Sequence, residues 1–392
     1  MNDIQHIQLF ELVDNVRQWN PERDAPKDII EYIDISAIDR NSKKIPAITK
    51  IIGSEAPSRA RQLVKTEDIL VSTVRPNLNA VAQVTEEFNG ATASTGYCVL
   101  RPKNDLLDSR YLFHWVRTPV FVDNMMLLAT GASYPAVSDR IVKESRIPLP
   151  PLAEQQRIAA ILDQADALRT KRRAALAKLD TLLQATFLDM FGDPVTNPMG
   201  WGLKNLGDVL KLITYGLTVR PKYYDEGIPL ISAREIRYGF IDFASAPRIS
   251  FDDYQNLSDK GKPVQGDILF SKTGTIGYCA EVKTNQTFAI TQNAARMTFD
   301  QEILVNPFTL AYLRSYYFQD IAIRNAKGNA VKDLQLGVME RFPIYVPPLD
   351  LQNRFANIVT KIVSMKQIHI SAFTYLNNLF HALQQRAFQG EL

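Results

Sequence analysis

Polar side chains that could recognise another molecule follow two similar strands of the predicted structure. Residues Glu67–Ser72 and Gly266–Ser271 share one pattern: an acidic turn, an apolar strand and a closing hydroxyl residue. A short loop rich in hydrogen-bond donors comes directly after each strand. Arginine and lysine pair with guanine, and asparagine and glutamine pair with adenine, at the major-groove edges of DNA bases. If the ligand is DNA, these two loops are the candidates for base contacts.

The candidate contact residues gather in these loops and in further polar loops of each half of the chain. In the first half they are Ser72, Thr73, Arg75, Asn77, Asn79, Ser133 and Tyr134. In the second half they are Ser271, Lys272, Thr273, Thr275, Asn329 and Lys332, with Arg220 and Lys222 as contacts to phosphate. An ordinary place in a surface loop is the alternative for any one of them. The prediction therefore concerns the loops more than single side chains.

A basic stretch leads into the first of these loops. Between Arg40 and Arg75 the chain has eight basic residues and three acidic ones. Such a stretch could attract DNA phosphates. A basic loop that is merely solvated is the alternative.

The sequence lacks the residue patterns of common catalytic and metal sites. The glycine-rich phosphate-binding motifs and the Gly-x-Ser-x-Gly motif are absent, the four histidines are scattered, and Cys98 and Cys279 read as small buried apolar residues. A nuclease needs carboxylates and a lysine around a metal ion, and Asp267 with Glu281 and Lys283 has such a spacing. The first half has Asp68 followed by Ala82-Gln83-Val84 and so lacks this pattern. We therefore expect a non-catalytic protein without a metal ion or a cofactor of its own.

Composition is that of a soluble globular protein with more than one domain. The chain has 392 residues, a formal net charge of +3 and 46% hydrophobic residues. Chains beyond about 250–300 residues usually divide into domains. No apolar run reaches the roughly 18 residues that a membrane span requires, and the acidic, polar start does not resemble a signal peptide. We expect a cytoplasmic protein.

A long helix is predicted from Pro148 to Phe191, and a second copy of it follows 197 positions later. Apolar residues spaced three and four apart form a seam on each copy, as in helices that pack lengthwise. Arg172 and His369 interrupt the two seams at the same repeat position. Either each of them reaches solvent at the rim, or the pair fixes the register of the two helices or meets a partner. The predicted seam residues are Ile158, Ile161, Leu168, Leu179 and Leu182, and then Phe355, Ile358, Ile362, Leu376 and Leu379.

Matching segments recur at offsets of 196 to 199 along the chain, so a single module is written twice. Each module is a mixed α/β globule, a Pro-Pro stop and a long helix. The predicted divisions are residues 1–150, 151–192, 193–348 and 349–392. The expected fold class is α+β and multi-domain, with two mixed α/β domains joined by two long antiparallel helices that pack as a coiled coil.

The length of the two helices, together with two different sets of polar loops, suggests a spacer. About 38 helical residues span about 57 Å, which is somewhat under two turns of B-DNA at roughly 34 Å per turn. A rigid spacer of this length suits the reading of two short sequences across an unread gap. Because the two sets of loops differ, the two sequences should differ as well.

These features together resemble the specificity subunit of a type I restriction-modification system, and the resemblance covers the whole chain in order. It is carried by the repeated Asp-Ile-Leu strands, the glycine loop before Pro148–Leu152, the helix opening Glu154–Ile158 and the restart at Trp201–Val209. The second helix departs from the pattern, because Glu154-Gln155-Gln156 becomes Leu351-Gln352-Asn353. The start of the chain also lacks the opening seen at Trp201.

The resemblance implies that residues 1–150 and 193–348 are target recognition domains, each reading half of a bipartite, asymmetric DNA site. It implies that the helices of residues 151–192 and 349–392 set the spacing and dock two methyltransferase subunits. Double-stranded DNA would be the ligand, and restriction and translocation subunits would join the full complex. S-adenosylmethionine would bind the methyltransferase partner. The alternative is a helix-mediated scaffold protein without DNA sequence readout, whose binding to DNA would not depend on the spacing of two sequence blocks.

Overall fold

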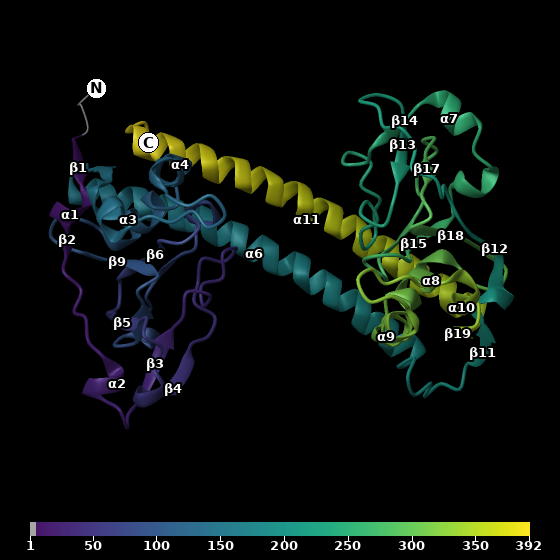
Figure 1. Ribbon diagram of the computed structural model, residues 1–392, viewed down its shortest axis with the longest axis horizontal. Coiled ribbons are helices and arrows are strands. Elements are labelled where there is room, and N and C mark those ends of the chain that lie inside the picture. Colours follow the sequence, from purple (N-terminus) through teal and green to yellow (C-terminus); the bar gives the residue numbers. More distant parts are fainter. Residues whose placement is uncertain (1–4) are drawn as a thin grey trace. The chain divides into compact units, whose positions relative to one another are not determined.

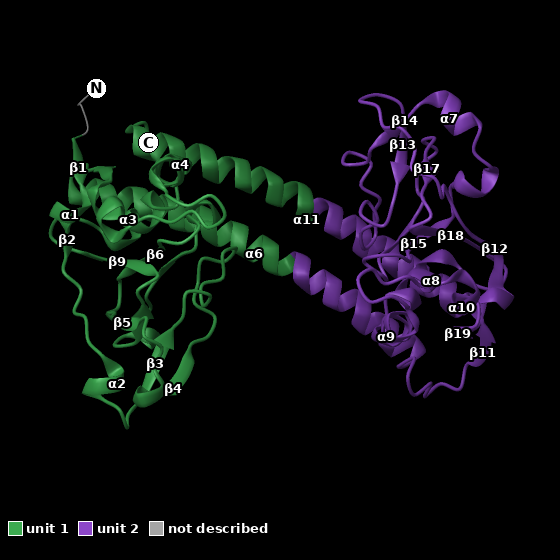
Figure 2. Ribbon diagram, in the orientation of Figure 1, with its two compact units in different colours: residues 1–175, 369–392 green, residues 176–368 purple. Residues whose placement is uncertain are grey.

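The computed structural model describes residues 5–392 and divides the chain into two compact units (Figure 2). Unit 1 contains the chain up to Ala175 together with His369–Leu392, and unit 2 contains Leu176–Ile368. Each unit therefore includes one globular part and portions of both long helices. No helix in the described part of the chain is long and apolar enough to cross a membrane.

Unit 1 is built on two four-stranded sheets and one strand pair (Figure 1). The first sheet is antiparallel in the order β2 (Val13–Asp14), β9 (Tyr97–Pro102), β6 (Ile69–Ser72) and β7 (Val81–Gln83). The second has the order β4 (Thr49–Ile52), β3 (Ile29–Ile33), β8 (Thr92–Ser94) and β5 (Ala60–Leu63), and β3 runs parallel to β8. The strand pair consists of β1 (His6–Gln8) and β10 (Arg146–Pro148).

The helices of unit 1 share one apolar core with the first sheet. They are α1 (Leu9–Leu12), α3 (Ser109–Trp115), α4 (Pro119–Leu128) and α5 (Asp139–Glu144), and a short α2 (Pro21–Asp24) lies elsewhere in the unit. Three of these helices have a side-chain N-cap: Asp108 caps α3, Thr118 caps α4 and Ser138 caps α5. Each capping side chain accepts hydrogen bonds from backbone N–H groups of the first turn. Single 3-10 turns cover Gly53–Glu55, Pro76–Leu78 and Glu86–Phe88.

Unit 2 repeats this plan. Its antiparallel sheet has the order β12 (Leu210–Tyr215), β18 (Ala294–Phe299), β15 (Ile268–Ser271) and β16 (Cys279–Glu281). The smaller sheet has the order β14 (Arg248–Ile249), β13 (Ile228–Ile231) and β17 (Ala289–Ile290), and β11 (Gly202–Asn205) pairs with β19 (Pro343–Val346). Helices α7 (Phe251–Gln255), α8 (Asn306–Leu313), α9 (Tyr316–Asn325) and α10 (Leu336–Met339) and 3-10 turns at Leu206–Val209 and Asp259–Gly261 complete it. The predicted internal duplication is confirmed.

The two long helices are α6 (Leu152–Phe191) and α11 (Leu349–Gln389), as predicted. Each begins after a Pro-Pro pair, which cannot continue an upstream helix. Each ends at a glycine in the left-handed region, Gly192 with φ +78° and Gly390 with φ +76°, where a side chain would be strained. Proline at the start and glycine at the end thus fix the bounds of both helices.

Contacts between α6 and α11 within each unit run in antiparallel order. In unit 1, Arg169 Nε donates to Asn377 Oδ1 at 2.7 Å, and Arg157 donates to the carbonyl of Leu392, just after α11, at 2.8 Å. In unit 2, Lys366 Nζ donates to Asp180 Oδ1, and the rings of Phe191 and Phe355 are 5.3 Å apart. Later residues of α6 therefore meet earlier residues of α11.

The same buried glutamine clamps the start of each long helix to its globule. Gln155 Oε1 accepts the N–H of Asp108 at 2.9 Å, and its Nε2 donates to the carbonyls of Leu106 at 3.0 Å and Pro150 at 2.9 Å. Gln352 makes the equivalent three bonds to residues 197 positions further on, Val305, Ile303 and Pro347. This side chain is retained where its neighbours Glu154 and Gln156 are not, because leaving three buried backbone groups unpaired would be costly.

The structure corrects the predicted seam at three positions. Leu168, Leu182 and Leu379 are 52%, 48% and 38% exposed. The buried apolar positions instead include Leu162, Phe187, Phe191 and Phe380, which lie in the cores of the two globules. An α-helix with 3.6 residues per turn drifts away from a strict 3-4 spacing, and each globule covers another face of the helix. Ile158, Leu179, Phe355 and Ile362 are buried, and Ile161, Ile358 and Leu376 are partly buried.

The two polar interruptions of the seams lie together in unit 1. Arg172 Nη1 is 2.9 Å from His369 Nδ1. Arginine is always a donor, so the imidazole nitrogen accepts this hydrogen bond. The contact fits the register hypothesis, which stays a prediction.

Candidate nucleic-acid interface

Two loops of unit 1 are joined to each other beside the end of β6. Residues 73–79 and 130–137 form what we call loop pair 1. Val74 and Thr130 both bridge Ala136, Arg75 N–H donates to the carbonyl of Pro135 at 2.7 Å, and Val137 N–H donates to the carbonyl of Thr73 at 2.9 Å. The pair is thus an ordered surface that brings together two segments more than fifty residues apart.

Unit 2 builds the equivalent arrangement, loop pair 2, from residues 272–277 and 327–335. Thr273 and Lys327 both bridge Asp333, and Leu334 N–H donates to the carbonyl of Lys272 at 2.8 Å. Gly131 in the first pair and Gly328 in the second have φ of +96° and +111°. A Cβ atom at Gly328 would lie 2.2 Å from the carbonyl oxygen of Val331. The turn therefore requires glycine.

Loop pair 1 presents a cation stacked on an aromatic ring. The guanidinium carbon of Arg75 lies 4.2 Å from the centroid of the Tyr134 ring, and Tyr134 is 66% exposed. No ion pair within residues 5–392 involves Arg75. A stacked arginine loses little further conformational freedom when it binds, and its planar fork matches guanine or phosphate. The arrangement can therefore offer an oriented donor pair to DNA.

Loop pair 2 instead surrounds a neutralised lysine. Lys272 Nζ lies 2.6 Å from Asp333 Oδ1, and the Thr273 hydroxyl donates to the same oxygen. Burial acts to raise the pKa of the Asp333 carboxyl, but the hydrogen bonds from Lys272 and Thr273 outweigh it and hold that pKa below its usual value. The carboxylate of Asp333 therefore largely neutralises the positive charge of Lys272.

An open hollow of about 590 Å³ adjoins this lysine. Three amide side chains line it, those of Gln292, Asn293 and Gln335, beside Tyr215, Lys272, Thr273, Asp333, Leu336 and Gly337. Amides can pair with the major-groove edge of adenine. These amides are not among the contact residues predicted from the sequence. Gln292 and Asn293 lie in the short polar segment between β17 and β18.

Three predicted contact residues are turned into the protein. Ser72 Oγ donates to the carbonyl of Val74 at 2.9 Å, Thr73 Oγ1 donates to the carbonyl of Gly96 at 2.9 Å, and Ser271 Oγ accepts the N–H of Tyr278 at 2.8 Å. All three residues are buried. Buried hydroxyls need such partners, so these side chains hold the loops in place and the prediction of base contacts is corrected for them.

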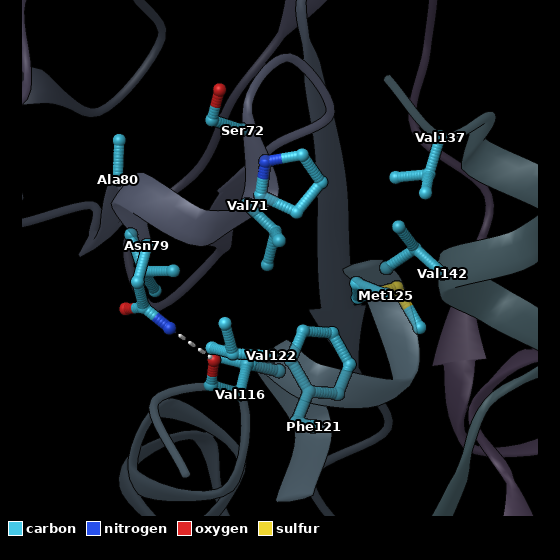
Figure 3. Close-up of a pocket in the computed structure, with 12 residues that line it drawn as sticks. Val71, Ser72, Asn79, Ala80, Val116, Phe121, Val122, Met125, Val137 and Val142 are labelled. Carbon is cyan, nitrogen blue, oxygen red and sulfur yellow. Dashed lines mark hydrogen bonds between the residues drawn. The ribbon is translucent and has the colours of Figure 1, made fainter. Parts of the chain in front are cut away.

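Asn79 is also committed within unit 1. Its Nδ2 donates to the carbonyl of Val116 at 3.2 Å, and its Oδ1 accepts from Lys43 Nζ at 3.0 Å. The 3-10 turn before it closes over an apolar cavity of about 10 Å³ that includes Phe121 and Met125 (Figure 3). A space of that size holds about one water molecule. The turn is therefore held in place over a small internal cavity and does not open into a ligand site.

The remaining predicted residues reach the surface. Exposed members of the loop pairs are Asn77, Ser133, Tyr134, Thr275, Asn329 and Lys332. Arg220 and Lys222 are exposed in the segment after β12, near Tyr223 and Tyr224 at 5.7 Å and 5.3 Å from the ring centroids. This segment starts beside the hollow, because Gln292 N–H donates to the carbonyl of Leu217 at 2.9 Å. Of the predicted contact residues, Lys272 and Thr273 line the hollow itself.

The acidic residues of the nuclease alternative are engaged within the scaffold. Asp267 is fully buried and pairs with Arg296 Nε at 2.6 Å, while Glu281 accepts from Asn306 Nδ2 at 2.8 Å and lies 3.6 Å from Lys283 Nζ. Unit 1 has the same buried pair, Asp68 with Arg101 at 2.6 Å. Within residues 5–392 no group of three histidine, cysteine or acidic side chains has the arrangement of a metal site. The aspartate at this repeat position, Asp68 or Asp267, therefore stabilises the scaffold in both copies.

Comparison with known proteins agrees with the repeated architecture. A family model described as type I restriction modification DNA specificity domain matches residues 8–178 and 198–372. The Type I restriction enzyme EcoBI specificity subunit of Escherichia coli is 24% identical over 363 residues, which cover 84% of this chain and 74% of that protein. The MjaIX specificity subunit of Methanocaldococcus jannaschii is 25% identical over 397 residues, which cover 94% of this chain and 86% of the relative.

Solved structures show the same fold. A chain from a study of the assembly and conformational transition of the type I R-M system superposes with a TM-score of 0.61 and 25% identity, covering 99% of this chain and 98% of that chain. The type I S subunit from M. genitalium superposes with a TM-score of 0.60 at 15% identity, covering 99% and 97% of the two chains. Because the family model matches both copies of the repeated module, this protein belongs to the family of type I restriction-modification DNA specificity proteins.

Proposed function

We propose that this chain is the non-catalytic specificity subunit of a type I restriction-modification complex. Each globular domain, residues 1–150 and 193–348, would read one half of a bipartite, asymmetric sequence in double-stranded DNA. One observation carries the proposal: loop pairs 1 and 2 are the same ordered surface built twice, with different exposed chemistry on each copy. A repeated frame that carries unlike polar surfaces suits the recognition of two unlike sequences.

The long helices, residues 151–192 and 349–392, would form an antiparallel coiled-coil spacer between the two half-sites. Helices of 40 and 41 residues would each extend about 60 Å at 1.5 Å per residue. A separation on that scale would leave unread base pairs between the half-sites.

The same helices would dock two methyltransferase subunits. Support comes from one face of α11 with three exposed large apolar residues, Met365, Ile368 and Tyr375, whose exposed fractions are 48%, 68% and 67%. Apolar surface of this kind on a polar helix usually marks a binding face. S-adenosylmethionine would bind the methyltransferase subunits, restriction and translocation subunits would join the full complex, and the assembly would act on DNA in the cytoplasm.

The test is to map methylated adenines in DNA from cells that carry this chain together with its methyltransferase partner. The proposal expects one bipartite motif with two different halves and a fixed gap. Methylation without a bipartite motif would contradict it. If the chain is a scaffold protein, binding to duplexes will not depend on the spacing of two sequence blocks.

A change in helix length sharpens this test. Insertion of seven helical residues between Ala175 and Leu176, together with seven between Ile368 and His369, lengthens both helices by about 10 Å. The unread gap should then grow by about three base pairs, at roughly 3.4 Å each. The control is a seven-residue insertion between Asn285 and Gln286, in an exposed loop of unit 2. A gap that stays the same length in the helix variant would rule out the spacer role.

A further inference from the structure

Six basic residues of unit 1 gather where a loop of the globule meets α6. Arg40, Lys43 and Lys44 lie in the loop of residues 39–44, and Lys171, Arg172 and Arg173 lie in α6. Arg173 Nη1 donates to the carbonyl of Asn41 at 2.8 Å, which joins the loop to the helix. We call these six residues the basic cluster. Arg40, Lys44 and Lys171 are exposed, and the other three are half-buried.

The charge of the basic cluster is not neutralised within unit 1. Among residues 5–392, none of its six side chains forms an ion pair with a carboxylate. The nearby carboxylate of Asp39 accepts the N–H groups of Asn41 and Ser42 at 2.8 Å and 2.6 Å. Asp166 is taken by Arg117 at 2.9 Å and Arg169 at 3.0 Å. Asp39 offsets part of this charge, and among residues 5–392 the cluster keeps a net positive charge without an ion-paired carboxylate.

Lys43 is also close to two cations outside the cluster, Arg117 and Arg169. Burial, followed by the charge of Arg117, lowers the pKa of the Lys43 ammonium to about 8, and Arg169 acts in the same direction. The carboxylates of Asp166 and Asp39 oppose this shift without cancelling it. An anion beside the cluster would relieve the repulsion among these cations.

The basic cluster is continuous with loop pair 1. Lys43 Nζ donates to both the carbonyl and Oδ1 of Asn79, in the loop that also presents Arg75. A ligand that meets the stacked Arg75 and extends along unit 1 therefore finds the cluster next to it. A polyanion of regularly spaced charges fits this continuity better than an acidic patch on a protein.

The repeated scaffold does not require this cluster. The matching loop of unit 2 keeps the bridge, Ile236 to Ile241 in place of Asp39 to Lys44, but it has Tyr238, Gly239 and Phe240 after its single arginine. The matching segment of α11 is Lys366-Gln-Ile-His-Ile370, against Arg169-Thr-Lys-Arg-Arg173 in α6. The same fold therefore forms in unit 2 without these cations.

We propose that the basic cluster binds backbone phosphates of duplex DNA in the unread gap next to the first half-site. The inference rests on the proposed function, since α6 would span that gap and Lys171 lies near the midpoint of Leu152–Phe191. The contact is independent of sequence, because phosphates carry no base information. It anchors the gap on one side only, toward the half-site that unit 1 reads.

The test uses the complex of this chain with its methyltransferase subunits and a triple variant, Arg40→Gln, Lys44→Gln and Lys171→Gln. These three residues make none of the loop-to-helix hydrogen bonds of the cluster. Binding is measured across a range of salt concentrations on two duplexes, one with the mapped bipartite sequence and one with both halves scrambled. Each lost phosphate contact should reduce the slope of log affinity against log salt by about 0.9, so the variant should lose about 1 to 3 in slope on both duplexes.

The control variant removes three cations of the same unit outside the cluster, Arg23→Gln, Lys27→Gln and Lys65→Gln. All three side chains are exposed, and α2, which contains Arg23, lies at the end of unit 1 remote from α6 (Figure 1). Its salt slope should match that of the wild-type complex. An unchanged slope for the cluster variant on both duplexes would overturn the proposal. Loss of the methyltransferase subunits with an unchanged DNA slope would overturn it too, and would identify an acidic protein surface as the occupant.

A change in the DNA supplies a second measurement that leaves the protein intact. Neutral methylphosphonates placed in the gap beside the first half-site should weaken binding of the wild-type complex and have little further effect on the cluster variant. The same substitutions beside the second half-site should affect both complexes equally. Additive losses on the first side would contradict the proposal. Failure of the wild-type complex to distinguish the two duplexes would count against the proposed function, whereas the slope on the scrambled duplex would still report on the cluster.

Discussion

Loop pair 1 and loop pair 2 use one frame to present different electrostatic surfaces. In the first, Arg75 is stacked on the exposed ring of Tyr134 and lacks a carboxylate partner among residues 5–392. In the second, Asp333 neutralises Lys272, and amide side chains line the neighbouring hollow. The bridges that hold the loops together are the same in both. The backbone frame is therefore the same in both copies of the module, and the exposed side chains differ.

The contacts that occur in both copies of the module are buried within each unit. The glutamine clamps at Gln155 and Gln352 and the buried pairs of Asp68 and Asp267 recur with the same geometry. Since these interactions support each copy in the same way, a comparable loss should follow from breaking them in either unit. Residues that differ at matching positions should instead affect one half-site only.

The largest effect should come from the repeated buried pairs. Asp68→Ala leaves the guanidinium of Arg101 without its partner in unit 1, and Asp267→Ala does the same to Arg296 in unit 2. Breaking a buried pair costs roughly 3–5 kcal/mol, and the loss should be confined to the unit that carries the change. Hydrogen exchange followed by mass spectrometry measures each unit separately.

Asp105→Ala and Asp252→Ala are the matched controls, since both carboxylates are exposed. Surface changes of this kind usually stay within about 0.5 kcal/mol. Equal destabilisation by the control and the buried variants would show that the repeated pairs are not central to the scaffold.

A smaller effect should follow from Arg75→Ala in loop pair 1. If the stacked guanidinium pairs with a guanine, its loss should cost about 1–3 kcal/mol and relax specificity at one position of the first half-site. Selection of bound duplexes from a pool with both half-sites randomised shows which position changes. Arg140→Ala, an exposed arginine of α5 that pairs with Glu144, is the control. Relaxed specificity in the second half-site would contradict the assignment of loop pair 1 to the first.

The smallest effect should come from Asp333→Asn in loop pair 2. The change removes a carboxylate next to the DNA surface and leaves Lys272 with its full charge. Affinity should rise several-fold at low salt, and the salt slope should steepen by up to about 0.9, as for one added phosphate contact. Asp320→Asn in α9, whose partner is Arg324, should leave both quantities unchanged. Weaker binding by the Asp333 variant would mean that the carboxylate matters more for holding Thr273 and Lys272 in place.

Much of the fold follows from local patterns in the sequence. The repeat, the Pro-Pro starts of α6 and α11, the apolar strands β6 and β15 and the polar loops after them are each set by neighbouring residues. The periodicity of the long helices predicted their length well and their buried faces less well. Leu168, Leu182 and Leu379 are exposed because the face that is covered depends on where each globule packs, which spacing along one helix does not encode.

The sequence by itself determined that one module is written twice, that two unlike sets of polar loops follow equivalent strands, and which family the chain resembles. Tertiary structure decided which of those polar side chains are available. Ser72, Thr73 and Ser271 are turned inward to backbone partners, Asp333 neutralises a lysine 61 positions away, and a loop 132 positions from Arg173 completes the basic cluster. The physical reason is that exposure and charge pairing are set by groups that meet only after the chain has folded.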